Sequence, residues 1–179
     1  MVSHDITTEN DIWEWLKEVP DPEIPVLSII DLGIVRGVEY VSRKGPAKIT
    51  ITPTYSGCPA MVVIGEEIHA TMKRHGVEDF VLETVLSPAW TTDWMSEDAK
   101  ERLRAYGVAP PSRLVNIASS ERRTPVLKMG TDDRMSFVVV CPQCGSARTE
   151  VISHYGSTAC KALYKCLSCR EPFDAFKCH

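Results

Sequence analysis

The stretches CPQCG at residues 141–145 and CLSC at residues 166–169 decide how the end of the chain folds. Each holds two cysteines separated by two residues, and 21 residues lie between the two pairs. A two-residue gap lets both sulfurs of a pair reach one metal ion from a tight turn. Two such turns complete the four-thiolate shell of a structural zinc site. The spacing therefore predicts a β zinc ribbon in which one Zn²⁺ is bound by Cys141, Cys144, Cys166 and Cys169.

Two disulfides are the alternative use of these four cysteines. Residues 1–15 are too polar for a signal peptide, and no stretch approaches the roughly 20 apolar residues of a membrane span. We therefore expect a cytoplasmic protein with no membrane partner, in which thiols stay reduced and this spacing favours metal. Because a ribbon this short buries little apolar surface, we expect zinc to supply much of its stability.

The charge of the 179-residue chain is uneven, although its formal total is only −4. Residues 1–110 hold 10 Lys and Arg against 18 Asp and Glu, a net of −8. Residues 111–135 and 136–179 each hold 5 against 3, a net of +2. Affinity for nucleic acid grows with the number of phosphates neutralised. This balance argues against a nucleic-acid-binding ribbon.

Hydrophobic periodicity predicts a small α/β domain with a single sheet in the first part of the chain. The expected elements are a helix over 8–19, strands over 35–41 and 47–54, a helix from 59 to 75, a strand over 80–86 and a helix over 96–106. We expect this domain to span residues 1–108. A linker over 109–135 and a separate zinc-ribbon domain over 136–179 complete the predicted organisation.

Cys58 stands alone in the acidic domain, between a predicted strand and the helix that begins at Pro59. A helix N-terminus stabilises a thiolate, so this position predicts a lowered cysteine pKa. Such a thiolate is able to ligate iron or attack an electrophile. A small buried cysteine used as filler fits the position equally well.

Three acids, Asp21, Glu23 and Asp31, interrupt the apolar run DPEIPVLSIIDLGIV at 21–35. Spacing alone favours solvated carboxylates or caps of backbone N–H groups over a site. In the tail, Cys160 and Cys178 are either spare buried thiols or part of a second, exchangeable site. The sequence assigns no role to His179.

The chain lacks a phosphate loop, a Gly-x-Ser-x-Gly elbow and a His-Glu-x-x-His pair. We therefore expect an accessory protein without a self-contained catalytic site. A thiol enzyme that uses Cys58 as nucleophile lacks a histidine at motif spacing. His69 and His75 are expected at the surface of their helix rather than as ligands.

Residues 8–107 resemble the family of SufT and the eukaryotic cytosolic iron–sulfur targeting factors. The resemblance is carried by DPEIPVLSIIDLGIV at 21–35, TPTYSGCP at 52–59 and the SPAW loop at 87–90. It implies a SufT-like iron–sulfur maturation domain in which Cys58 is the functional cysteine. Glu23, Asp31, Thr52 and Thr54 fall on the family's other characteristic positions.

The segments CPQCGS, GSTACKALYKC and EPFDAFKCH, joined to such a domain, are similar to the PaaD (PaaJ-type) family of bacterial phenylacetate degradation. That resemblance implies a protein that accompanies the multicomponent phenylacetyl-CoA epoxidase and helps mature one of its metal centres. The implied partners are the subunits of that complex, especially the ferredoxin-type reductase. The implied cargo is iron or an iron–sulfur cluster.

One cysteine cannot hold a cluster that normally takes four protein ligands. We therefore expect Cys58 to hold its cargo transiently, shared with a partner or across a homodimer. A non-catalytic structural subunit of the oxygenase, without metal transfer, is the alternative interpretation.

Overall fold

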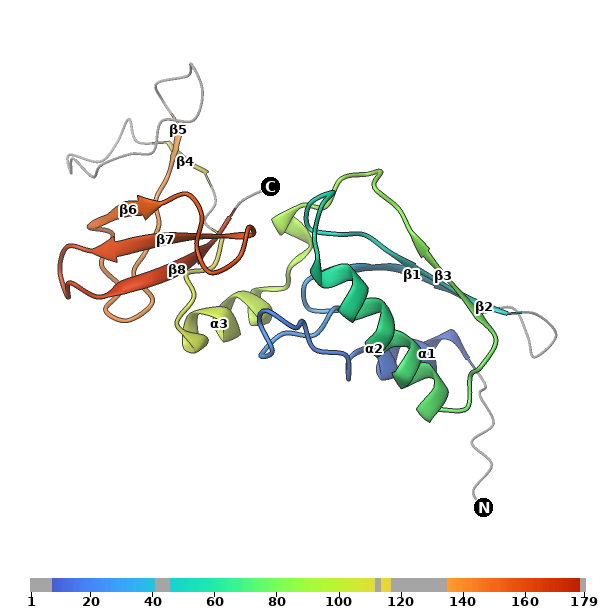
Figure 1. Cartoon of the computed structure of the whole chain (residues 1–179). Coiled ribbons are helices and arrows are strands. Elements are labelled where there is room, and N and C mark those ends of the chain that lie inside the picture. Colours follow the sequence, from blue (N-terminus) through green and yellow to red (C-terminus); the bar gives the residue numbers. More distant parts are fainter. Residues whose placement is uncertain (1–7, 41–45, 112–113, 117–134, 178–179) are drawn as a thin grey trace. The chain divides into compact units, whose positions relative to one another are not determined.

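The structure is a computed structural model that describes residues 8–40, 46–111, 114–116 and 135–177 (Figure 1). The chain divides into two compact units, Met1–Ala99 and Lys100–Cys178. The expected α/β domain with a separate β ribbon is confirmed. The domain boundaries predicted from the sequence stay predictions, because much of the expected linker lies outside the described residues.

The first unit is built around a three-stranded sheet with the order β1-β2-β3. β1 pairs with β2 antiparallel, and β2 pairs with β3 in parallel. The helix α2 connects β2 to β3 along the chain. The elements follow the order predicted from hydrophobic periodicity. Their bounds are α1 Glu9–Leu16, β1 Val35–Glu39, β2 Ala47–Ile51, α2 Ala60–Arg74, β3 Phe80–Thr84 and the short 3-10 helix η1 Thr92–Trp94. Helix α3, Glu97–Tyr106, begins at the end of the first unit and lies mostly in the second.

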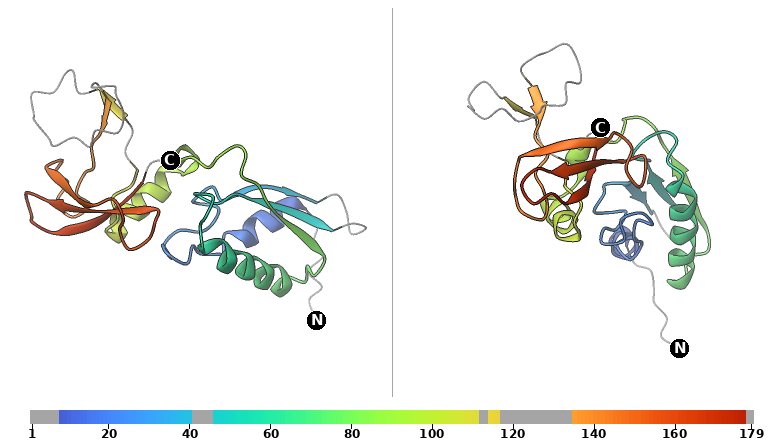
Figure 2. Two further views of the ribbon diagram at one scale, coloured as in Figure 1. Left: turned by 45° about the horizontal axis from the view of Figure 1, so that its top comes forward. Right: turned by 60° about the vertical axis from the view of Figure 1, so that its left-hand side comes forward.

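The helices α1 and α2 cover one face of this sheet (Figure 2). Side chains on the covered face of β2, Ala47, Ile49 and Ile51, are at most 1% exposed. They form the core with the buried stripes of α1 and α2, and each large apolar side chain contributes about 1.5–3 kcal/mol on burial. The stripe residues are Ile12, Leu16, Ile64, Ile68 and Met72.

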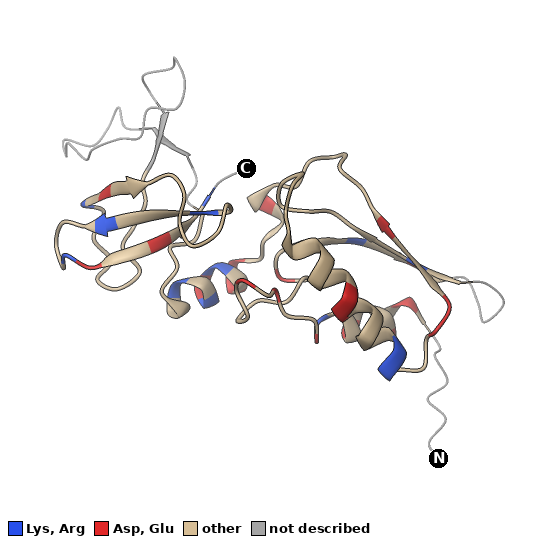
Figure 3. Ribbon diagram, viewed as in Figure 1, with Lys and Arg blue, Asp and Glu red and all other residues tan. Residues whose placement is uncertain are grey.

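On the open face, Lys48 Nζ lies 3.6 Å from a Glu39 oxygen and 3.0 Å from a Glu83 oxygen. Such exposed ion pairs contribute little to stability, because solvent and salt screen them. Acidic residues are spread over α1, α2, β3 and the connecting loops rather than gathered in one patch (Figure 3).

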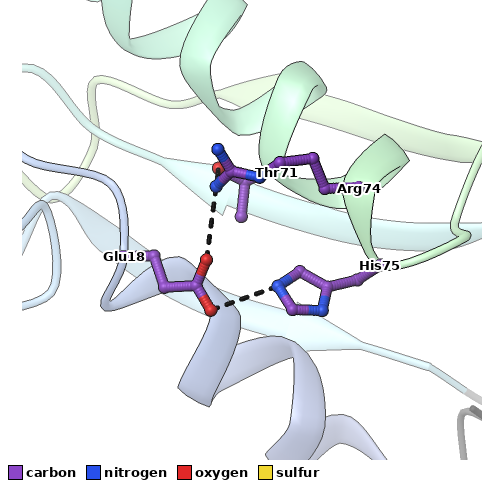
Figure 4. Close-up of polar contacts among 4 residues, drawn as sticks. All are labelled: Glu18, Thr71, Arg74 and His75. Atoms are coloured by element: carbon purple, nitrogen blue, oxygen red, sulfur yellow. Dashed lines mark hydrogen bonds and ion pairs between the residues drawn. The ribbon is translucent and has the colours of Figure 1, made fainter.

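Glu18, just after α1, joins that helix to the C-terminal end of α2 (Figure 4). Its two carboxylate oxygens lie 3.2 Å from Arg74 Nη2 and 3.1 Å from His75 Nε2. Arg74 also donates to Thr71 Oγ1 at 3.0 Å, and the His75 ring stacks on Trp15 with a centroid distance of 4.5 Å. These surface contacts fix how the two helix ends meet. His75 is thereby used in packing, as its expected surface position allows.

The second unit contains the zinc ribbon, an antiparallel sheet with the order β6-β7-β8. Its strands are β6 Thr149–Ser153, β7 Lys161–Cys166 and β8 Pro172–Phe176. Ala109 extends this sheet beside β8, since its N–H donates to Asp174 O at 2.8 Å and its carbonyl accepts from Phe176 N at 2.9 Å. The first residue of the expected linker is thus part of the ribbon's hydrogen bonding.

Two short strands also occupy the region that the sequence suggested was unstructured linker. β4 Leu114–Asn116 pairs antiparallel with β5 Met135–Phe137. Weak periodicity concealed them, because three residues are too few to show alternation. Val140, between β5 and the first knuckle, is exposed.

The glycine of the Asp-Leu-Gly sequence holds a backbone position that no other residue fits. Gly33 has φ of +67°, and a Cβ built on it would lie 2.7 Å from Trp94 Cβ. We predict that Gly33→Ala costs about 2–4 kcal/mol of unfolding free energy, from left-handed strain and overpacking together.

The matched control is Gly37→Ala in β1, because a Cβ there meets nothing within 4 Å. Urea unfolding followed by tryptophan fluorescence should give a free energy of unfolding for Gly37→Ala within about 0.5 kcal/mol of wild type. Equal midpoints for the two variants would contradict the predicted contact.

Candidate functional site

The four knuckle cysteines converge on one point. Their sulfur atoms all lie within 4.8 Å of one another, with 3.7 Å between Cys141 and Cys169 and 3.6 Å between Cys144 and Cys166. A tetrahedral zinc ion with Zn–S bonds of about 2.3 Å requires sulfurs about 3.8 Å apart. The arrangement of the sulfurs therefore fits one zinc ion, and the ribbon is a structural zinc site.

The two knuckles have the same backbone turn. Gly145 N–H donates to Cys141 O, and Arg170 N–H donates to Cys166 O, both at 2.9 Å. The residue after each second cysteine has positive φ, 70° at Gly145 and 69° at Arg170. The tight turns expected at the two cysteine pairs are confirmed, whereas the left-handed arginine was missed because nothing in its side chain indicates it. The Ser146 and Ser168 hydroxyls, 2.8 Å apart, join the knuckles.

Backbone amides prepare the second knuckle for a thiolate. Burial raises the pKa of Cys166, but the N–H groups of Cys169 and Ser168, directed at its sulfur, bring that pKa down to about 6. The thiolate is the form that binds metal. Cys141 and Cys166 are also members of the ribbon's small core, with Ala109, Phe173 and Ala175.

Cys58 lies in the turn between β2 and α2, in the first unit. Its N–H donates to Tyr55 O at 3.1 Å, and its side chain is partly exposed. The pKa lowering expected from its position is wrong. Burial raises the pKa of Cys58 and outweighs the hydrogen bonds from the Ala60 N–H and the Thr54 hydroxyl. Helix α2 begins only at Ala60, so Cys58 stands outside its first turn.

Two carboxylates, Glu23 and Asp21, also raise the pKa of Cys58 through their negative charge. The structure thus brings the Thr54 hydroxyl to the Cys58 sulfur and places the charges of Glu23 and Asp21 within electrostatic reach of it. Asp21 has a second task, because its Oδ1 accepts from the N–H groups of Glu23 and Ile24 at 2.9 and 2.8 Å. Local spacing indicated that capping role, but the effect of its charge on Cys58 depends on tertiary folding.

Asp31 and Thr52 are engaged in the loops that support this region. Asp31 Oδ2 accepts from both the N–H and the hydroxyl of Ser28 at 2.8 Å, which closes a turn. Thr52, 1% exposed, donates its hydroxyl to Val85 O at 2.6 Å and so ties the end of β2 to the end of β3. Trp90, 4% exposed, donates its indole N–H to Leu32 O at 2.8 Å. These contacts fix the loops before and after the sheet.

Among the described thiols of the second unit, Cys160 is not a member of the four-sulfur cluster. Cys160 is buried, and its sulfur lies 3.0 Å from the Thr158 hydroxyl. Cys178 and His179 lie outside the described residues, so a second site that includes them stays a prediction. His69 is exposed and packs against the Phe80 ring.

Comparison with known proteins assigns both parts of the chain. Residues 9–85 match the family model for the iron–sulfur cluster assembly protein, and residues 128–177 match that for the PaaD zinc beta ribbon domain. A protein of Escherichia coli (strain K12), named as a subunit of a 1,2-phenylacetyl-CoA epoxidase, is 47% identical over 169 residues. That match covers 94% of this chain and 92% of the relative. The chain belongs to the PaaD family.

Two shorter relatives of this PaaD-family chain match about half of its length. An Fe-S protein maturation auxiliary factor of Porphyromonas gingivalis (strain ATCC BAA-308 / W83) is 37% identical, covering 52% of this chain and 89% of the relative. The Fe-S protein maturation auxiliary factor YitW of Bacillus subtilis (strain 168) is 38% identical, covering 48% of this chain and 82% of the relative. Among the described residues, the helices fall short of the length and hydropathy that crossing a membrane requires.

We predict that removing zinc unfolds the ribbon. Structural zinc contributes roughly 10–16 kcal/mol in comparable small sites, and here two of its ligands also belong to the core. Cys166→Ser should lose bound zinc and the near-ultraviolet dichroism of Tyr164 and Phe173. Cys160→Ser, which changes a buried thiol outside the cluster, is the matched control and should keep about one zinc per chain. Zinc content of Cys166→Ser equal to wild type would contradict the assignment.

We predict that Cys58 is a slow nucleophile at neutral pH. Burial and the nearby carboxylates raise its pKa, so its alkylation by iodoacetamide should reach half-maximal rate at a pH above that of a free cysteine. Glu23→Gln removes one of those charges and should shift the profile to lower pH. Glu66→Gln, at an exposed position of α2, should leave the pH profile of Cys58 alkylation unchanged. Mass spectrometry of the Cys58 peptide gives the rate, and identical profiles for wild type and Glu23→Gln would contradict the coupling.

Proposed function

We propose that this chain is an accessory maturation factor for the multicomponent phenylacetyl-CoA epoxidase, in the cytoplasm. It helps deliver or insert iron or an iron–sulfur cluster, and the ferredoxin-type reductase subunit is its recipient. The name of the Escherichia coli relative supports the link to the epoxidase, and the names of the shorter relatives support the maturation role. In this proposal the chain has no catalytic step of its own.

The observation that carries this proposal is the surroundings of Cys58. A partly exposed thiol lies beside the Thr54 hydroxyl, within electrostatic reach of the Glu23 and Asp21 carboxylates. Thiolate and carboxylate are both ligands for iron, but one cysteine is too few to retain a cluster. Weak and open ligation suits a carrier, which must release its cargo. The raised pKa of Cys58 adds to this weakness, since a proton competes with the metal for the sulfur.

We further propose a division of labour along the chain. Residues 1–108 form the transfer module, residues 109–135 the linker, and the ribbon over 136–179 docks on the epoxidase complex. Glu23 and Thr54 assist Cys58 directly. Asp31 and Thr52 hold the loops that place it.

A non-catalytic structural subunit is the second candidate, and the name of the Escherichia coli relative, which calls that protein a subunit of the epoxidase, favours it. Under this alternative the protein co-purifies with the active epoxidase in fixed proportion, and Cys58 serves packing alone.

The test compares wild type with Cys58→Ser, and with Cys160→Ser as a control for loss of a thiol. Each protein is purified without oxygen and its zinc, iron and sulfide contents are measured. We expect about one zinc per chain in all three, and iron or a cluster chromophore in wild type and Cys160→Ser only.

The same three proteins are then supplied to cells that lack the native factor, and the cluster content and activity of the reductase are measured. Cys58→Ser should fail to restore them, while its zinc and unfolding midpoint match wild type. Full restoration by Cys58→Ser would reject transfer through Cys58 and favour the structural subunit.

A further inference from the structure

The three-stranded sheet of the first unit has two edges that differ in their protection. Natural proteins block edge strands with bulges, charges or prolines, because unpaired backbone groups there recruit other strands. The β1 edge carries such devices, with a bulge between Val35 and Gly37, the charged Arg36, and a Glu9 carboxylate that accepts from Tyr40 N–H at 3.2 Å.

The β3 edge lacks these devices. Its register with β2 runs without a shift from Phe80 to Thr84, and the strand contains no Lys, Arg or Pro. Its one charge, Glu83, is paired with Lys48 at 3.0 Å. Val81 in the strand and Leu86 just after it are 49% and 59% exposed. This strand is therefore a regular and largely apolar edge in the described part of the sheet.

The parity of the hydrogen bonds shows which backbone groups face that edge. Asp79 O accepts from Ala47 N, and Val85 N donates to Ile51 O, so odd-numbered residues bond to β2. In a parallel ladder, alternate residues direct their N–H and C=O to opposite sides of the strand. The backbone groups of Phe80, Leu82 and Thr84 therefore point away from β2, along the free edge.

We propose that this edge pairs antiparallel with β3 of a second copy of the chain, about a two-fold axis at Leu82. Leu82 then faces Leu82 of the copy, and Phe80 faces Thr84. Each opposed pair exchanges two backbone hydrogen bonds, so the outward groups of all three residues are satisfied at once. The pairing doubles the three-stranded sheet and protects the edge.

The side chains suit this two-fold arrangement. Phe80 opposite Thr84 is an aromatic and β-branched pair, which stabilises antiparallel strands. On the other face Val81 stands opposite Glu83, so neither Glu83 meets a like charge directly, and both keep Lys48 as counter-ion. A strand from a different protein would need side chains that match this register, whereas β3 of a second copy supplies them by symmetry.

The experiment measures the mass of the full, zinc-loaded chain by sedimentation equilibrium. We expect wild type to be a dimer at micromolar concentration. Thr84→Pro removes an N–H that faces only the edge, and this should raise the dimer dissociation constant by about tenfold or more, since each copy loses one donor. Thr84→Ala keeps the N–H and should stay close to wild type.

Hydrogen exchange on wild type gives a test that needs no variant. The amides of Phe80, Leu82 and Thr84 should gain protection as protein concentration rises, while the amide of Arg36 on the other edge should not. A monomeric wild type, or exchange at these amides that is independent of concentration, would overturn the dimer and leave the edge to an extended segment of another protein. Because Cys58 takes no part in this pairing, the result is independent of the metal-transfer proposal.

Discussion

Coordination of one zinc ion by four thiolates is the constraint on which the second unit depends. The strands β6 to β8 enclose only a few apolar side chains, and two of the ligands are themselves in that core. Hydrophobic burial alone therefore supplies little stability to this unit. Zinc replaces the missing core by joining two turns that are 21 residues apart in the sequence. The first unit has the opposite balance, because its sheet and two helices bury a full layer of large aliphatic side chains.

In the first unit, the same polar groups shape the loops and set the chemistry at Cys58. Asp21 caps two backbone amides and places negative charge near the thiol. Thr52 ties two strand ends together, and Thr54, two residues later, contacts the sulfur. A substitution at Asp21 would therefore disturb structure and reactivity together. This overlap explains why sequence spacing alone favoured a structural interpretation of the acids.

Much of the fold was predictable because it depends on local signals. The Cys-x2-Cys pairs fix the metal site by spacing, and apolar periodicity with Gly76 and Gly107 fixes the ends of the helices, where both glycines have positive φ. The features that were missed depend on tertiary contacts. The pKa of Cys58 follows from burial that the linear sequence does not record. Ala109 joins the ribbon through pairing with a strand more than sixty residues away, and Arg170 adopts a glycine-like turn only because the knuckle imposes it.

The four-sulfur cluster also changes the electrical character of the tail. Counted with neutral cysteines, residues 136–179 carry 5 basic against 3 acidic side chains, or +2. Four thiolates around one Zn²⁺ add a net charge of −2, so the loaded ribbon is close to neutral. Long-range attraction to a charged partner is then weak. In the docking proposed for this ribbon, recognition must rest on short-range shape and hydrogen bonding, and association should depend little on ionic strength.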